Sequence, residues 1–475
     1  MMDGGMKNSR DGGWGWMIVA ASFVTMICTR SVTRCVSIFF VEFQMQFSTD
    51  YSTTSWIHSL LDFTTMLCAP LGSYVGNRLS TRVAVMTGGL LSSVGLVVSS
   101  FAPSLQFLYI SLGILTGLGF ALSYTPVVAM VGTYFNERKA LAYGITMSGR
   151  GVGIFILPPL IQYLIDLYSW RGALLTLGGL VSNLCVCGAL MRPPVGEREN
   201  VKPNLDEPDV QEDLKTVKLT DIGQNEDKCD KEQEEEKSLL RSQGGQASHE
   251  GQLRKRRDPE CCFFPSSDKY GFLFKLDFLL LAVSFLFLAF GCSMLFVYLV
   301  PYSLSVDISQ HQAVLLMSIL GGMGIVGNIT FGWISDRKCL RTFRVVAFLI
   351  AVGFEGLGCL FVPLLRSFST LVSFSVFYGF FDGAYMGLIP VVTCDIVGCP
   401  HLSSALGVIG FLHAIPYLIS PPIAGWLLDR SGSYTALFLL SGLSLLCSAF
   451  LLAALALLHY CCRERSVSLQ NPQQT

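Results

Sequence analysis

Charged side chains inside long apolar stretches are the residues best placed to do chemistry in this sequence. Arg30 and Arg34 are four residues apart in the first stretch, so they are expected to share one face of a helix. A charge in hydrocarbon costs at least about 2.5–3.5 kcal/mol on insertion scales, so each arginine requires a partner or a function. A guanidinium group binds a carboxylate through two parallel hydrogen bonds. The two arginines therefore predict either ion pairs between helices or a binding site for an anion.

Acidic side chains in other apolar stretches would balance these arginines. Asp62 follows His58 by one helical turn, and Asp382 lies far downstream among glycines. A ligand with a carboxylate at one end and a cationic group at the other needs a base and an acid. Arg34 and Asp382 belong to opposite halves of the chain, which suits a ligand site between the halves near the middle of a membrane. The alternative is that Asp382 forms an ion pair with an arginine and locks the halves in one state.

Arg150 lies in a glycine-rich stretch, from Ser148 to Gly153. Small residues allow helices to approach closely, so this segment is expected to move against a neighbour. Arg150 is therefore a candidate gating residue, and it joins Arg30 and Arg34 as a candidate partner of Asp382. Glu355 lies in a further apolar stretch, where we expect it to form a structural ion pair.

The composition indicates a membrane protein and argues against several other classes. The chain has 475 residues, of which 51% are hydrophobic and 14% are charged, and its mean hydropathy is +0.53. Soluble domains carry about 25% charged residues. The net charge of -1 argues against a nucleic-acid binder, which needs a broad basic surface. We find no nucleophile elbow, metal-ligand cluster or phosphate-binding loop, so the sequence predicts neither an enzyme nor a bound cofactor or metal.

The apolar stretches predict about twelve membrane-spanning helices and therefore an all-α membrane protein. A span needs about 20 apolar residues, and about twelve stretches reach that length. Those in the first half of the chain cover about residues 15–40, 56–76, 83–101, 105–132, 141–164 and 171–191. Those in the second half cover about residues 275–303, 312–334, 343–364, 369–397, 404–427 and 434–460.

Polar segments divide the chain into two helical bundles, a linker and two tails. The predicted bundles cover residues 15–191 and 271–460, and the tails cover 1–14 and 461–475. The highly charged segment 192–270 cannot bury enough apolar surface to fold alone, so it is predicted to be a disordered linker. Lys and Arg are concentrated in the short loops on the side of this linker, which predicts that the linker and both termini are cytoplasmic. The basic run from Arg254 to Arg257 suits contact with anionic membrane lipid.

An internal repeat relates the two predicted bundles. Pro158-Pro159 is followed by Asp166, and 263 residues later Pro421-Pro422 is followed by Asp429 with the same gap. Further identities keep this offset from Ala142/Ala405 to Leu180/Leu443, and chance alone rarely keeps register for this long. Two bundles related in this way follow the parallel-repeat plan of the major facilitator class.

Short motifs next to the predicted spans resemble those of known transporters. The stretch from Gly332 to Lys338 resembles the cytoplasmic gate motif of the major facilitator class, which makes Asp336 and Arg337 candidate gating residues. The stretches from Asp11 to Trp16 and from Tyr134 to Gly144 resemble the paired signatures of the monocarboxylate transporter family. This resemblance implies a multi-pass plasma-membrane transporter of a small carboxylate. It also implies a single-span glycoprotein partner of the basigin type.

Departures from that family's pattern change the expected substrate and coupling. Lactate-carrying relatives typically have a lysine at the position of Arg34, and arginine cannot release its proton as lysine can. Proton-coupled relatives carry an aspartate and an arginine where this sequence has Gly324 and Asn328. These departures favour a facilitative carrier that is not proton-coupled, with a proton-coupled lactate or pyruvate symporter as the alternative. Further resemblance within the family, in Cys28 to Cys35 and Gly379 to Tyr385, implies creatine or a related guanidino acid as the substrate. The candidate substrate-binding residues are Arg34, Asp382, Arg30, Asp62 and Asn328.

Overall fold

The computed structural model describes residues 13–135, 139–192, 276–335, 343–397 and 402–470. These residues all belong to one compact unit of the chain. Across these ranges the regular structure is entirely helical, which confirms the predicted all-α class. The candidate gating residues Asp336 and Arg337 and almost all of the predicted linker lie outside the described residues.

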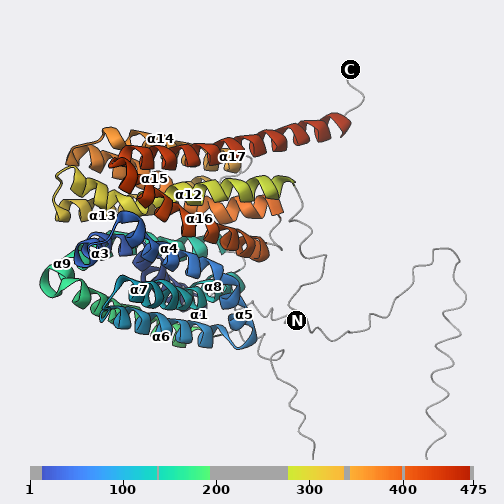
Figure 1. The fold of residues 1–475 in the computed structure, drawn as a ribbon. Coiled ribbons are helices and arrows are strands. Elements are labelled where there is room, and N and C mark those ends of the chain that lie inside the picture. The colour runs from blue at the N-terminus through green and yellow to red at the C-terminus, as the bar shows by residue number, and fades with distance from the viewer. Residues whose placement is uncertain (1–12, 136–138, 193–275, 336–342, 398–401, 471–475) are drawn as a thin grey trace, which may run out of the picture. The chain divides into compact units, whose positions relative to one another are not determined.

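Figure 1 draws the helices of the first half in blue to green. They are α1 (Trp14–Met26), η2 (Ile27–Ser31), α2 (Val32–Cys35), η3 (Val36–Ile38), α3 (Phe39–Phe47), α4 (Tyr51–Leu67), α5 (Ala69–Arg78), α6 (Thr81–Ser99), α7 (Leu105–Leu108), η4 (Tyr109–Leu115), α8 (Thr116–Tyr134), α9 (Lys139–Val181) and α10 (Asn183–Leu190). Serine side chains start two of these helices. Ser80 accepts a hydrogen bond from the amide of Val83, and Ser104 accepts one from the amide of Phe107. Such caps satisfy amides that have no partner inside the helix.

The helices of the second half are longer and have fewer breaks, and Figure 1 draws them in yellow to red. They are α12 (Leu276–Ser305), α13 (Gln310–Ser335), α14 (Arg344–Phe361), η9 (Val362–Leu364), α15 (Phe368–Val397), α16 (Leu402–Ser431) and α17 (Tyr434–Gln470). The four helices α12, α13, α15 and α16 have 26 to 30 residues each. A membrane span needs about 20 residues, so each of these helices can cross a membrane with some tilt.

Ten segments of the described chain are long and apolar enough to cross a membrane. One of them, Ala142–Leu190, contains two predicted spans, because the backbone of Ser169 has a φ of 60° and interrupts α9. Another crossing is formed by α4 and α5, and it is not among the ten because α4 has only 17 residues and a turn at Cys68 separates it from α5. With these two additions, the twelve predicted spans are confirmed.

Each half of the chain has its own hydrophobic core. The largest cluster of buried apolar side chains comes almost wholly from the second half, and two further clusters come almost wholly from the first. Between the halves, α4 packs against α16 and α9 packs against α13. The internal repeat relates the second span to the eighth and the fifth to the eleventh, so these two contacts are equivalent. The halves are therefore two similar bundles that meet through two similar helix pairs.

Polar contacts also join the halves at the ends of the spans that lie away from the chain termini, which we call the far side. Asp429, near the end of α16, accepts hydrogen bonds from the amides of Tyr51 and Ser52 at 3.1 and 2.9 Å. The carboxylate thereby caps the positive end of α4. Gln310, at the start of α13, donates a hydrogen bond of 3.2 Å to Glu42 of α3. These contacts hold the two bundles together on the far side.

Glycines allow α13 and α15 to approach closely within the second bundle. A Cβ atom added at Gly383 would collide with the backbone carbonyl of Gly324, and one added at Gly379 would collide with that of Leu320. Close backbone approach favours helix association in lipid, where no hydrophobic driving force acts between helices. This approach fixes the backbone on both sides of Asp382.

Replacing Gly383 with alanine is expected to destabilise the protein by about 1–3 kcal/mol or more, because the new methyl group must displace the backbone of α13. Gly144→Ala is the matched control, since a Cβ atom there meets nothing within 4 Å. Thermal unfolding of both variants in one detergent measures the difference. Equal unfolding temperatures would contradict tight packing of α13 on α15.

Candidate functional site

The first span is irregular around its two arginines. The π-helical turn η2 contains Arg30, and the 3-10 turn η3 begins two residues after Arg34. Single π-helical turns are frequent at functional sites, because the wider turn changes the direction of the side chains that follow. The two arginines consequently reach different neighbours, although their spacing predicted a shared face. Arg30 contacts α4 and α8 of its own half, and Arg34 contacts α16 of the other half.

Arg34 lies between the halves with 6% of its surface exposed. Its Nη1 is 3.8 Å from Oδ2 of Asp62 in α4, and its Nη2 donates a hydrogen bond of 3.2 Å to the hydroxyl of Tyr417 in α16. Its guanidinium carbon is 4.5 Å from the ring centroid of Phe296 in α12. The separation of 3.8 Å is too long for a hydrogen bond, and Nη1 has no hydrogen-bond partner among the described residues. Arg34 therefore retains a buried donor for a further acceptor.

The other candidates of the first half have neighbours of different kinds. Nε2 of His58 lies 3.9 Å from Oδ2 of Asp62, one turn further along α4, as the spacing predicted. Arg30 instead lies beside Met66, with Nη2 at 3.7 Å from the sulfur, and 4.0 Å above the ring of Tyr124. Within the described ranges, no carboxylate lies within 4.0 Å of Arg30. A cation–π contact, worth about 2 kcal/mol when desolvated, stabilises its charge.

Arg150 and Asp382 form an ion pair that joins the two halves. Nη2 of Arg150 in α9 donates a hydrogen bond to Oδ2 of Asp382 in α15. Asp382 is 1% exposed, and its Oδ1 has no hydrogen-bond partner among the residues that the structure describes. Of the three arginines considered for Asp382, the structure selects Arg150. This contact matches the alternative in which Asp382 locks the halves in one state.

A cavity of about 50 Å³ lies beside this ion pair. Its lining includes Arg150, Asp382, Asn328, Gly151, Gly321 and Gly324. Asn328 thus lies close to both charged groups, as a substrate-binding role would require. Pockets that hold small ligands usually measure about 300–1,000 Å³, so a ligand could enter only if α9 and α13 moved apart.

Two features of this region did not follow from the sequence patterns. Tyr417, which binds Arg34, was not singled out, although a tyrosine hydroxyl next to a proline in an apolar helix usually requires a partner. The expected ion pair of Glu355 is wrong for the described part of the chain. Its carboxyl oxygen Oε2 lies 3.9 Å from the sulfur of Cys292, and no described cation lies within 4.0 Å.

Two helical bundles with an internal repeat, facing each other across buried charges, have the architecture of a secondary transporter. Residues 21–355 match the family model for the Major Facilitator Superfamily. The chain is therefore a multi-pass membrane transporter with the major facilitator fold, as the sequence predicted.

The chain belongs to the monocarboxylate transporter family. It is 58% identical over 455 residues to monocarboxylate transporter 12-B of Danio rerio, and the aligned region covers 96% of this chain and 90% of the relative. It is 55% identical over 460 residues to monocarboxylate transporter 12 of Homo sapiens, and the aligned region covers 97% of this chain and 83% of the relative. Monocarboxylate transporter 2 of Homo sapiens is more distant, at 31% identity over 432 residues, and the aligned region covers 91% of this chain and 83% of the relative. The predicted resemblance to this family, and within it to monocarboxylate transporter 12, is confirmed.

The variants Arg150→Met and Asp382→Leu are each expected to lower the free energy of unfolding by about 3–5 kcal/mol, because each leaves one buried charge without its counter-ion. The double variant removes both charges and is expected to be considerably more stable than either single variant. Unfolding in mixed detergent micelles measures all three. If the losses of the single variants simply add in the double variant, the two side chains do not interact.

Proposed function

We propose that the chain is a plasma-membrane carrier of creatine or a related small guanidino carboxylate. We propose that it works by facilitated alternating access and is not proton-coupled. The observation that carries this proposal is the pairing of Arg150 with Asp382 beside the unsatisfied Arg34, because the three groups offer both charges to a solute between the halves. The relatives' names, which refer to monocarboxylates, support a carboxylate as one end of the substrate.

Arg34 would bind the carboxylate of the substrate. Its Nη1 is buried and has no hydrogen-bond partner among the described residues, while Tyr417 and Phe296 hold the rest of the guanidinium in place. Charge-assisted hydrogen bonds from a guanidinium to a carboxylate are roughly twice as strong as neutral ones. Asp62 holds Arg34 from 3.8 Å, so a carboxylate in direct contact would compete well with it. Arg30, about one helical turn before Arg34, would add to the positive potential at this end.

The cationic end of the substrate would replace Arg150 at Asp382. A substrate guanidinium is chemically the same group as the end of an arginine side chain, so it can take over the same carboxylate oxygens. Arg150 would then be released from α15, and the contact between the halves would weaken. Binding would thereby be coupled to rocking of the bundles, because the substrate interacts differently with the two conformations. Asn328, beside the pair, would contact the substrate as an uncharged group.

The described contacts between the bundles support a conformation that is closed on the far side. The hydrogen bonds and ion pairs that join the halves lie near the middle of the spans or on the far side. If the basic loops place the terminal side in the cytoplasm, this conformation is closed to the outside. The substrate would leave it inward.

The lack of proton coupling rests on the chemistry of three positions. Arg34 cannot release its proton near neutral pH, and Gly324 and Asn328 cannot bind one. The second candidate is a proton-coupled lactate or pyruvate symporter. The contact of His58 with Asp62 favours this candidate, because histidine is the side chain whose unperturbed charge changes near physiological pH.

We also propose roles for two segments that lie almost wholly outside the described residues and for neighbouring molecules in the membrane. Asp336 and Arg337 would form a cytoplasmic gate, and the segment 192–270 would be a cytoplasmic linker between the bundles, on the same side as both termini. A single-span glycoprotein of the basigin type would accompany the carrier in the membrane. The basic run in the linker would contact anionic membrane lipid.

Arg34→Ala and Asp382→Ala are each expected to reduce uptake of labelled creatine by about ten- to a hundredfold, because each removes a charge-assisted interaction worth about 1.5–3 kcal/mol. Uptake into oocytes that express equal amounts of each variant at the surface measures the effect. Asp395→Ala is the control, since this partly exposed aspartate pairs with Arg344 within the second half. Unchanged uptake in both site variants would show that the assigned residues do not bind the substrate. No uptake in the unaltered protein would rule out creatine as the substrate.

Creatine uptake is expected to vary by less than about twofold between about pH 6 and pH 8, because no group assigned to the substrate changes its charge in that range. An inward proton gradient imposed on membrane vesicles should leave the initial rate unchanged. Strong acceleration of lactate or pyruvate uptake by the gradient would instead establish the symporter. His58→Gln would then test whether the histidine carries that dependence.

A further inference from the structure

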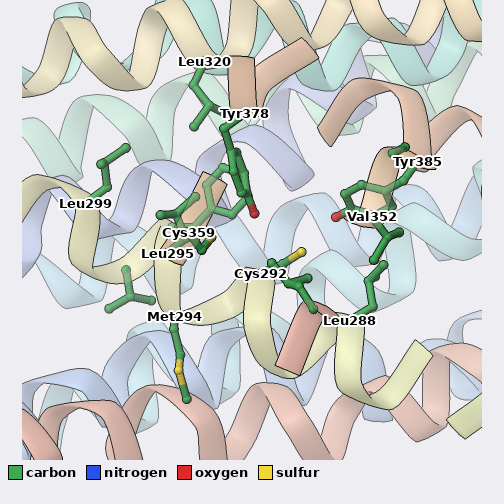
Figure 2. Packing of buried hydrophobic residues seen from close by; sticks show 14 of the residues in the cluster. Leu288, Cys292, Met294, Leu295, Leu299, Leu320, Val352, Cys359, Tyr378 and Tyr385 are labelled. Carbon is green, nitrogen blue, oxygen red and sulfur yellow. The ribbon is translucent and has the colours of Figure 1, made fainter. Parts of the chain in front are cut away.

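A buried polar cluster lies within the second bundle, and the proposed function does not use it. Glu355 of α14, Cys292 of α12, and Tyr378 and Tyr385 of α15 are each 0% exposed. Figure 2 shows the two tyrosine hydroxyls and the sulfur of Cys292 pointing into the space between them. The carboxyl of Glu355 contacts the same sulfur at 3.9 Å. Four polar side chains therefore share one enclosed site inside an otherwise apolar core.

No cation among the described residues balances Glu355. No described Arg, Lys or His lies within 4.0 Å of its carboxyl group, and Oε1 has no hydrogen-bond partner among these residues. The hydroxyls of Tyr378 and Tyr385 are likewise unpartnered in the described chain. Burial of an isolated ionised carboxylate is very costly, so a carboxyl group in such a place binds a proton instead. A neutral acid can donate to the sulfur or hydroxyl oxygens that surround it.

The remaining titratable groups near Glu355 favour the same assignment. Asp382 lies on the face of α15 that carries Tyr378 and Tyr385, one turn from each, and Cys359 lies one turn along α14 from Glu355. Among the described residues, Arg150 is the arginine that influences Glu355 electrostatically from another element, and it is already bound to Asp382. One cation cannot balance two buried carboxylates. Asp382 therefore holds the charge, and Glu355 holds the proton.

We propose that Glu355 is a proton-binding site and keeps its proton throughout the transport cycle. The role of Glu355 in transport rests on the proposed function, whereas the bound proton itself does not. Glu355 belongs to the same bundle as Cys292, which it contacts, and as the nearby Tyr378 and Tyr385, so rocking of the bundles leaves their arrangement unchanged. Glu355 is then a positioning residue, an uncharged donor that leaves Asp382 as the charged partner for Arg150 or the substrate.

The bound proton also sets the net charge between the halves. With Glu355 neutral, one positive charge remains in excess among the central groups, which are Arg30, Arg34, Arg150, Asp62 and Asp382. That excess charge attracts a carboxylate substrate into a region of low dielectric constant. An ionised Glu355 would cancel it. The proton on Glu355 thus serves selection for an anionic group, although it does not touch the substrate.

Infrared difference spectroscopy of the purified full chain tests the bound proton directly. The unaltered protein is expected to show a protonated-carboxyl C=O band that persists between about pH 6 and pH 8 and is absent in Glu355→Gln. The band is expected to remain in Asp382→Asn. A spectrum without this band, or one in which it appears only on acidification, would overturn the proposal. This measurement needs no transport activity, so it separates failure of the site from failure of the proposed function.

Transport of the same variants tests the role of the site. Glu355→Gln, which keeps a neutral donor of the same shape, is expected to retain creatine uptake within about twofold and a flat pH profile. Asp382→Asn makes the same chemical change at the charged aspartate and is expected to lose about tenfold or more. Monodisperse elution of both variants establishes folding. Equal losses in the two folded variants, or a pH-dependent uptake that Glu355→Gln flattens, would show that the proton leaves Glu355 and would overturn the proposal.

Discussion

Arg150 and Asp382 form an ion pair that is largely buried between the two bundles. In such an environment opposite charges attract far more strongly than in water, and a single charge left behind is very costly. The pair connects α9 to α15 and therefore one bundle to the other. The bundles can separate at this point only if other charges arrive to take the place of each partner. A solute that carries both charges meets this condition, and a neutral solute of the same size does not.

The glycines of α13 and α15 fix the position of Asp382 in this ion pair. Because the two helices touch through their backbones at Gly383 and Gly324, the backbone of Asp382 cannot shift without separating them. Close helix contacts without side chains between them leave little freedom for slow adjustment. Motion is therefore expected between the rigid bundles rather than within them.

Much of the fold could be predicted from the sequence, because a span in lipid must be a helix of about 20 apolar residues. The second span was found despite His58 and Asp62, since its neighbours are apolar enough on either side. The types of the charged residues at the site were also predictable, because burial of a charge in a membrane requires a reason. The choice among the candidate partners of Asp382 was not. The π-helical turn at Arg30 and the contact of Arg150 with Asp382 depend on which helices face each other, and sequence spacing within one helix does not contain that information.

The two pairs of buried charges have different places in the fold, and this difference suggests a different role in transport for each pair. Arg34 and Asp62 both belong to the first bundle, so their relation is preserved when the bundles rock. Arg150 and Asp382 belong to different bundles, so their relation is the one that changes. A pair that moves as one body suits a binding platform, whereas a pair divided between two bodies suits a latch. If this latch opens only in exchange for charge, the proposed platform would have to hold the substrate close enough to Asp382 for that exchange to occur.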